Sequence, residues 1–177
     1  MKQDNSLKNV VEELKSIHVK HEAAFKLSIL QQLKEMEPET FEKFSRSLLE
    51  TYGFTDVKVT QPSKDGGIDG YGKLEIGVNY LNVAFQCKRW KNKNVSRLEI
   101  DRFRGTSQGK YELGIIFTTS NFSREATNAM TQSGAVPIAL IDGLALIDIM
   151  IEKRFGVDYE TMPVYINALD RVLTEDI

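Results

Sequence analysis

Three polar side chains in the middle of the chain have the types and the spacing that metal-dependent hydrolysis of a phosphodiester needs. Asp69 ends the run Asp65-Gly-Gly-Ile-Asp69, and Gln86 and Lys88 follow, with only Cys87 between them. Residues at i and i+2 on a strand share a face, so Gln86 and Lys88 project together and Cys87 points the other way. If the strand that begins at Asp69 pairs beside theirs, the three side chains converge. Two of them can hold a divalent cation through oxygen, and the lysine can polarise the attacking water.

Each of these residues has its own predicted role. Asp69 is the first metal ligand, and Gln86 adds an uncharged oxygen, a weaker ligand for a hard cation. The expected cation is Mg²⁺, with Mn²⁺ as a substitute. Lys88 positions the water and stabilises charge at phosphorus. The competing interpretations are structural: a turn aspartate, a hydrogen-bonding glutamine at the core edge and an exposed strand lysine. Asp65 is expected to shape its turn or to support the site.

The residues that follow Gln86 are basic, although the whole chain has a net charge of −2. Eight basic and two acidic residues fall between Gln86 and Lys110, a net charge of +6, so the rest of the chain sums to −8. One interpretation is a solvated charged face. Because this stretch begins at the predicted site, we expect it to attract DNA instead. The predicted DNA contacts are Arg89, Lys91, Lys93, Arg97, Arg102 and Arg104.

The hydrophobic pattern predicts an α/β fold, with a mixed β-sheet flanked by helices on both faces. Proline and glycine mark several of the expected element ends. The expected domains are an N-terminal helical extension over 1–36, a catalytic domain over 37–156 and a tail over 157–177. The expected helices cover 4–36, 38–52, 97–110, 123–133 and 143–154, and the expected strands 57–61, 68–75, 80–89, 113–119 and 136–141.

The helix expected over 4–36 carries an apolar stripe at three- and four-residue steps, without an interrupting glycine or proline. It would be about 50 Å long, longer than a small domain needs. Two interpretations stay open: the helix lies along its own domain, or it pairs with a second copy as a dimer seam.

Several short motifs, taken together and in order, resemble the Mrr-type catalytic domain of the PD-(D/E)xK nuclease superfamily. The resemblance covers about residues 38 to 155 and implies a restriction-endonuclease-like core. The motifs are Phe41-Glu-Lys-Phe44, Leu48-Leu49, Tyr52-Gly-Phe54, Asp65-Gly-Gly-Ile-Asp69, Phe85-Gln-Cys-Lys-Arg-Trp90, Phe103-Arg-Gly105, Gly114-Ile-Ile-Phe-Thr-Thr-Ser120 with Phe122, and Ile141-Asp-Gly143.

This resemblance implies a Mg²⁺-dependent DNA endonuclease that acts in restriction of foreign DNA. It implies that Gln86 follows the pattern of Mrr-type members, which have glutamine where the PD-(D/E)xK motif has Asp or Glu. It further implies that the backbone carbonyl of Cys87 completes the metal coordination and that Glu42, on the preceding helix, assists the metal or the water. Two alternatives stay open: a repair or junction-resolving nuclease, and a non-catalytic DNA-binding or assembly module of a defence complex.

The composition limits the setting of the protein. A single cysteine excludes an internal disulfide, and its thiol is expected to pack into the core with Val83 and Phe85. No apolar run reaches the length of a membrane span, so a cytoplasmic protein is expected. One active site cuts one strand, so a double-strand break implies a homodimer or higher oligomer. No separate recognition motif stands out, which leaves room for a recognition subunit as a partner.

Overall fold

The structure is a computed structural model that describes residues 5–60 and 67–165. The chain divides into two compact units, Ala24–Val157 and Met1–Ala23 with Asp158–Ile177. The predicted Asp-Gly-Gly turn, with Asp65, lies largely outside the described residues. None of the helices that the structure describes is long and apolar enough to cross a membrane.

The larger unit is built on a five-stranded mixed sheet in the order β1-β2-β3-β4-β5. The first three strands pair antiparallel, and β3, β4 and β5 pair parallel. The predicted α/β fold with a mixed sheet is therefore confirmed. The strands are β1 (Phe54–Val59), β2 (Gly70–Ile76), β3 (Asn79–Lys88), β4 (Leu113–Thr118) and β5 (Ile138–Ile141). The helices are α1 (Asn5–Glu35), α2 (Pro38–Tyr52), α3 (Arg97–Ser107), α4 (Arg124–Thr127) and α5 (Gly143–Lys153).

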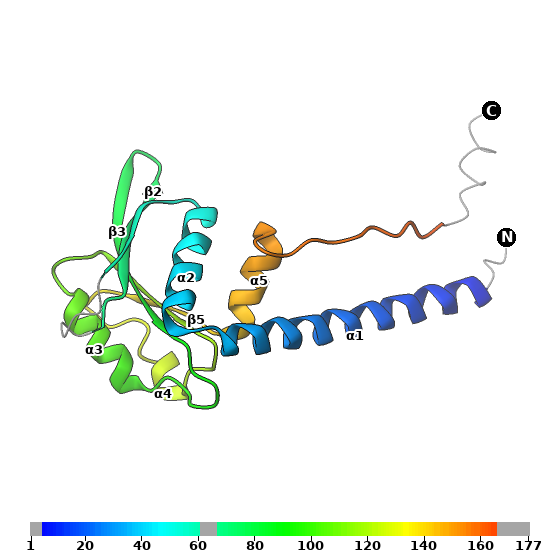
Figure 1. Ribbon diagram of the computed structural model, residues 1–177, viewed down its shortest axis with the longest axis horizontal. Helices are drawn as coiled ribbons and strands as arrows, with labels where there is room; N and C mark the ends of the chain where they lie inside the picture. The colour runs from blue at the N-terminus through cyan, green and yellow to red at the C-terminus, as the bar shows by residue number, and fades with distance from the viewer. Residues whose placement is uncertain (1–4, 61–66, 166–177) are drawn as a thin grey trace. The chain divides into compact units, whose positions relative to one another are not determined.

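Helices cover both faces of the sheet, with α2 and α5 on one face and α3 and α4 on the other (Figure 1). The core under α2 and α5 is built from large apolar side chains such as Phe41, Phe85 and Phe117. The core under α3 and α4 is smaller and includes Phe103 and Ile116. Alternate residues of β3 therefore belong to different cores, which fixes the face on which each polar side chain of this strand lies.

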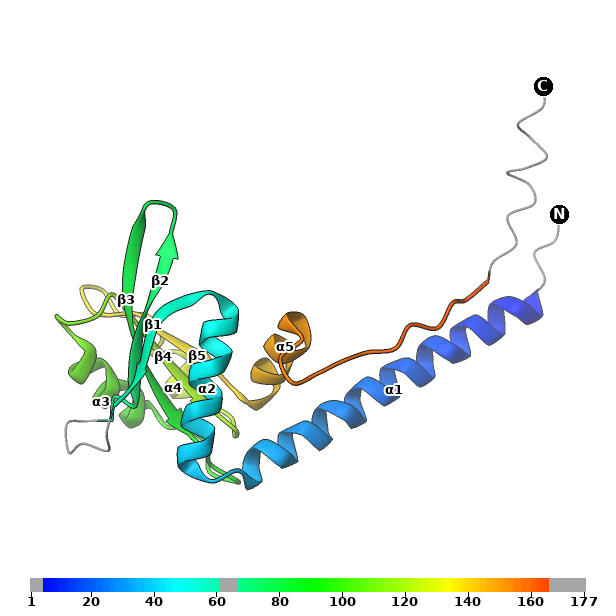
Figure 2. The ribbon, with the colours of Figure 1, turned by 45° about the horizontal axis from the view of Figure 1, so that its top comes forward.

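Local signals place both ends of α2 and the start of α5 where the sequence predicts them. Pro38 is the first residue of α2, and Gly53 ends that helix in the left-handed region with φ +111°. Asp142 caps α5, because its side chain accepts a hydrogen bond from Ala145 N at 2.9 Å. The β2–β3 hairpin extends beyond its neighbours in the sheet (Figure 2), and Val78 at its turn is almost fully exposed.

Three expected elements are shorter than the sequence indicates, and one is displaced. The helix expected over 97–110 ends at Ser107, and the strand expected over 57–61 runs instead over Phe54–Val59. The helix expected over 123–133 is reduced to Arg124–Thr127. The carbonyls of Ala129 and Met130 accept hydrogen bonds from the guanidinium of Arg104, so they have partners outside a helix. The strand expected over 136–141 begins only at Ile138, whose N–H donates to Met130 O at 2.9 Å.

The predicted long N-terminal helix is present as α1. Its last turns pack into the larger unit, where Leu33 is buried and Ile29, Leu30 and Met36 contact the core. The apolar side chains of its first turns, such as Leu7 and Ile17, are exposed.

Candidate functional site

The pairing of β2 with β3 brings Asp69 beside the end of β3. Gly70 lies opposite Phe85, so Asp69 stands next to Gln86. Two hydrogen bonds fix it there: Asp69 N donates to Phe85 O at 3.0 Å, and Cys87 N donates to Asp69 Oδ2 at 2.7 Å. The expectation that the strand after Asp69 pairs beside the Gln86–Lys88 strand is confirmed.

Two carboxylates with unusual protonation behaviour meet at this point. Burial raises the pKa of Asp69, against the lowering effects of the Cys87 amide and the Lys88 charge. Burial also raises the pKa of Glu42 on α2, and the neighbouring charge of Asp69 raises it further. The structure thus brings Glu42 within electrostatic reach of Asp69. A divalent cation between such groups would relieve both their repulsion and their lost hydration.

Gln86 has an unmatched acceptor. Its side chain is buried, and its Nε2 donates to the carbonyl oxygen of Gly67. Its Oε1 is buried without a hydrogen-bond partner among the described residues. Such an acceptor costs free energy unless a ligand or water satisfies it, so Gln86 fits the role of an oxygen ligand. Gly67 has φ +87°, and a Cβ there would overlap the Gln86 amide nitrogen, so this position requires glycine.

Cys87 lies on the other face, as strand alternation predicts. Its thiol packs against the core that contains Val83 and Phe85. Burial raises the pKa of this thiol, and a hydrogen bond with the Ser45 hydroxyl only partly offsets that rise. The thiol therefore stays protonated, which agrees with a structural side chain rather than a nucleophile. Its proposed contribution to the site is the backbone carbonyl.

Lys88 is held by a carboxylate that the sequence does not single out. Its Nζ lies 2.6 Å from Glu99 Oε2 on α3, with side-chain exposures of 12% and 20%. The charge of Lys88 and its hydrogen bond lower the pKa of Glu99. The same ammonium lies 5.1 Å from the centre of the Trp90 ring. Sequence reasoning did not single out Glu99 as the partner of Lys88, because in the sequence it is only one of two acids in a basic stretch.

The six residues predicted to contact DNA do not share one environment. Lys93, Arg97 and Arg102 are exposed on α3 or the loop before it. Lys91 is half exposed, and its Nζ lies 2.7 Å from Glu35 Oε2. Arg89 instead turns towards α1, where its Nη1 donates to Lys34 O at 2.9 Å and caps the last turn of that helix.

The prediction for Arg104 needs a correction. Its side chain is buried, and its guanidinium donates to the carbonyls of Val136, Ala129 and Met130 and contacts Asp101 at 3.1 Å. These hydrogen bonds link α3 to the segment before β5. The buried guanidinium is therefore not exposed to contact a phosphate. Its neighbour Arg102, with an exposed side chain, remains in the predicted set.

The donor set suits an oxygen-loving cation but is small. Within residues 5–60 and 67–165, no three His, Cys, Asp or Glu side chains gather as a metal-binding group. Two acids, Asp69 and Glu42, and the amide oxygen of Gln86 are what the described chain provides. Amide and carboxylate oxygens are ligands that Mg²⁺ accepts, and it keeps several waters in such sites.

Comparisons with known proteins give a family and a fold. The family model of the Mrr catalytic domain, described as a restriction endonuclease, matches residues 33–150. Among solved structures, the chain is similar to the DNA modification-dependent restriction endonuclease AspBHI, with TM-score 0.61 and 23% identity. It is also similar to the MspJI restriction endonuclease in complex with a 27-mer oligonucleotide, with TM-score 0.51 and 21% identity.

Both alignments cover 75% of this chain, but only 36% and 33% of the AspBHI and MspJI chains. This chain therefore spans about a third of the proteins whose structures it resembles. No curated protein matches it. The family model covers well over half of the chain and includes the paired strands that bear Asp69, Gln86 and Lys88, so the chain belongs to the Mrr-type restriction endonuclease family.

Proposed function

We propose that the protein is a Mg²⁺-dependent DNA endonuclease that hydrolyses phosphodiester bonds in the restriction of foreign DNA. The observation that carries this proposal is the buried, partnerless Oε1 of Gln86 beside the Asp69 carboxylate. Family membership and the likeness to two restriction endonucleases support the substrate and the setting. A cytoplasmic location agrees with that setting.

Asp69, Gln86 and the Cys87 carbonyl would hold the cation, and Mn²⁺ could replace Mg²⁺. The bound ion would lower the pKa of a coordinated water and offset charge on the phosphoryl oxygens. Glu42, whose pKa is raised by burial and by Asp69, would accept a hydrogen bond from that water or support the ion. Neutral Gln86 leaves the site one negative charge short of an all-carboxylate site.

Lys88 would position the attacking water and stabilise the charge that grows at phosphorus. Glu99 keeps its ammonium in one place, at 2.6 Å, instead of letting a long side chain sample many rotamers. Fixed charges need no reorganisation during the reaction, which is the main source of electrostatic catalysis. We therefore assign Glu99 as a positioning residue for Lys88.

The exposed cations Lys93, Arg97 and Arg102, together with Lys91, would contact phosphates that flank the scissile bond. Such contacts position DNA without reading its sequence. We keep Arg89 among the proposed DNA contacts, although its Nη1 donates to Lys34 O at the end of α1.

A double-strand break needs two sites, so we propose a homodimer or a higher homo-oligomer. The exposed apolar side chains in the first turns of α1 support a dimer seam there, as part of an N-terminal extension over residues 1–36. We also propose that a separate recognition subunit assists substrate choice.

The test is cleavage of methylated and unmethylated supercoiled plasmid, with Mg²⁺ or with chelator, by the wild type and by Lys88→Ala. We expect metal-dependent nicking or linearisation that the variant loses. The methylation arms would give the first rule for substrate choice. DNA binding without cleavage at any metal concentration would contradict the proposal and favour a non-catalytic module.

A further inference from the structure

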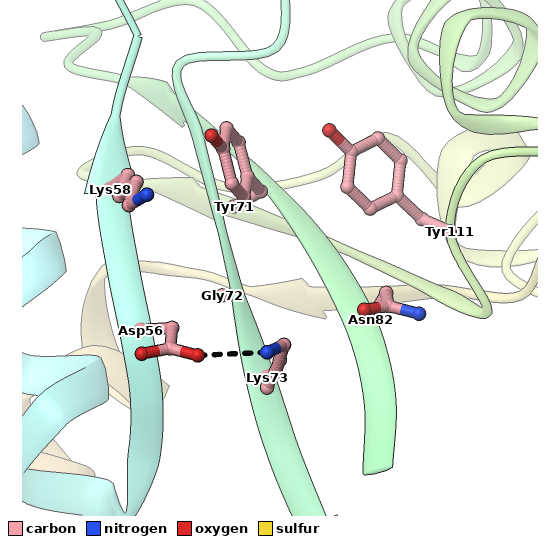
Figure 3. A pocket seen from close by; sticks show the side chains of 7 residues that line it. All are labelled: Asp56, Lys58, Tyr71, Gly72, Lys73, Asn82 and Tyr111. Carbon is pink, nitrogen blue, oxygen red and sulfur yellow. Dashed lines mark hydrogen bonds and ion pairs between the residues drawn. The ribbon is translucent and has the colours of Figure 1, made fainter.

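A second feature lies on the sheet, away from the proposed catalytic residues. It is a cleft of about 240 Å³ that none of Asp69, Gln86, Lys88 or Glu42 lines. We name it the tyrosine cleft; its lining residues, drawn in Figure 3, are Asp56, Lys58, Tyr71, Gly72, Lys73, Asn82 and Tyr111.

The tyrosine cleft and the candidate site share one face of β3. In the sheet, Lys73 lies opposite Asn82 and Tyr71 lies opposite Ala84. Two-residue steps along the strand lead from Asn82 through Ala84 to Gln86, so these side chains point to the same side. At about 3.4 Å per residue, Asn82 and Gln86 are about 14 Å apart along β3. That length equals about four base-pair rises of B-DNA.

Two aromatic rings form one wall of the tyrosine cleft. The centres of the Tyr71 and Tyr111 rings are 6.2 Å apart, and the rings are tilted by 40°. A flat ring between them would need about 7 Å, twice the carbon–carbon contact distance, so they cannot enclose one. Tyr71 as a whole is 36% exposed. The face of its ring that is turned away from Tyr111 can therefore still stack against a ligand ring.

The loop that carries Tyr111 is fastened to β3. Glu112 N donates to Asn82 O at 2.9 Å, and a Glu112 carboxylate oxygen accepts from Asn82 N at 2.6 Å. These two bonds hold the backbone of Asn82, and its side chain lines the tyrosine cleft. An asparagine amide both donates and accepts, which suits the polar edge of a nucleobase.

A bulge in β1 shapes the opposite wall. The register shifts between Thr55 and Lys58, and Asp56 takes a left-handed backbone conformation with φ +53°. The bulge turns Asp56 so that its Oδ2 lies 2.8 Å from the Nζ of Lys73 (Figure 3). Gly72 leaves room for this, because a Cβ there would come within 3.0 Å of Val57. Lys58 adds a second cation.

We propose that the tyrosine cleft binds one nucleotide of a DNA strand whose base has left the duplex stack. The base would stack on Tyr71 with its edge at Asn82, and its phosphates would lie near Lys58 and Lys73. Both faces of a paired base are covered by its neighbours, so only an unpaired or everted base can offer a free face to tyrosine. The volume suits one ring system, being below that of drug-sized ligand pockets. This inference rests on DNA being the substrate, as proposed above.

The test compares binding of two labelled oligonucleotides to the full chain by fluorescence anisotropy, with chelator present to prevent cleavage. One is a fully paired 20-mer duplex and the other is the same duplex with one unpaired nucleotide near its centre. We expect the wild type to prefer the second by about 5- to 150-fold, the range that stacking of one base supports. Tyr71→Ala should remove this preference, whereas Tyr71→Phe should keep it.

Tyr80→Ala is the matched control, because Tyr80 is an exposed tyrosine on the same hairpin that does not line the cleft. Equal binding of both duplexes by the wild type, or a preference that survives in Tyr71→Ala, would overturn the inference. A preference that Tyr80→Ala also removes would do the same, because it would reflect the hairpin as a whole.

A free nucleotide has the same ring and phosphate chemistry, so a competition arm uses a deoxynucleoside monophosphate. Displacement of the unpaired-base duplex at micromolar nucleotide would overturn the assignment to a DNA strand. Failure of the proposed function looks different. DNA binding with the Tyr71-dependent preference but without metal-dependent cleavage would support the cleft and refute the nuclease.

Discussion

Two lysine–carboxylate pairs lie on the same face of the sheet, and they differ in how much water reaches them. Lys88 and Glu99 are 2.6 Å apart, with side-chain exposures of 12% and 20%. Lys73 and Asp56 are 2.8 Å apart, with exposures of 46% and 65%. Nearly equal distances thus describe unequal interactions, because water screens the exposed pair and leaves the other largely unscreened.

The same contrast appears on α3, where Arg102 and Arg104 are two positions apart. Arg102 is exposed, whereas Arg104 is buried among backbone carbonyls. Burial turns a cation into part of the framework, and exposure leaves it available to a polyanion. On α3, exposure therefore separates the two arginines more clearly than their positions in the sequence do.

The largest expected effect separates the two lysines. Lys88→Ala should lower the cleavage rate by about 10²–10³-fold, as expected when one preorganised charge in an active site is lost. Lys73→Ala should lower it by less than about 10-fold, because an exposed cation contributes mainly to DNA binding. Single-turnover cleavage at saturating enzyme measures both. Equal losses of cleavage rate in the two variants would show that burial does not separate the roles of the two lysines.

The arginines should differ in stability. Arg104→Met leaves buried carbonyls without their donor and should lower the free energy of unfolding by about 3 kcal/mol. Arg102→Met should change it by less than about 0.5 kcal/mol. Urea denaturation checks both. Arg102→Met should also reduce the salt slope of DNA binding by about one. If the folded Arg104→Met variant shows this reduction and Arg102→Met does not, Arg104 contacts DNA and the correction made above is wrong.

The two carboxylates test the ion pairs directly. Glu99→Gln should lower the free energy of unfolding at pH 7 by about 1–3 kcal/mol, between the values for exposed and buried pairs. The pKa of Glu99 is lowered in the folded state, so this contribution is present above the ordinary value of 4.5 and is lost as the pH falls through the lowered value. Urea midpoints between pH 3 and pH 7 measure it.

Asp56→Asn is the control for that series. Because its pair with Lys73 is exposed, we expect the urea midpoint of Asp56→Asn to match that of the wild type across the same pH range. A loss in Asp56→Asn as large as that in Glu99→Gln would show that burial does not separate the pairs.

The last effect concerns the metal. The raised pKa values of Asp69 and Glu42 mean that, without a cation, stability is fully present below the ordinary values and is lost as the pH rises through the raised ones. Mg²⁺ should restore this stability at neutral pH and raise Tm.

Gln86→Glu should tighten Mg²⁺ binding by about 10-fold, or about 1.4 kcal/mol, as measured by calorimetry. Unchanged affinity would exclude Gln86 as a ligand. Asp69→Asn should abolish the rise in Tm that Mg²⁺ produces.

The order of the elements, the ends of α2 and the strand pairing that brings Asp69 beside Gln86 and Lys88 could be predicted from the sequence alone. These depend on local rules: Pro38 and Gly53 set the ends of α2, and a two-residue strand period puts Gln86 and Lys88 on one face while Cys87 enters the core. Such rules act over a few residues, so they can be read without knowing what packs against them.

Which charged side chains are buried depends on the tertiary structure and could not be predicted from the sequence. Glu99 reaches Lys88, and Arg104 reaches Val136, through contacts between segments that no local pattern relates. The tyrosine cleft needs a bulge in β1, a glycine in β2 and the loop after α3 to meet. The energy of a charge depends on all the groups around it, and those neighbours are set by packing between segments that are distant in sequence.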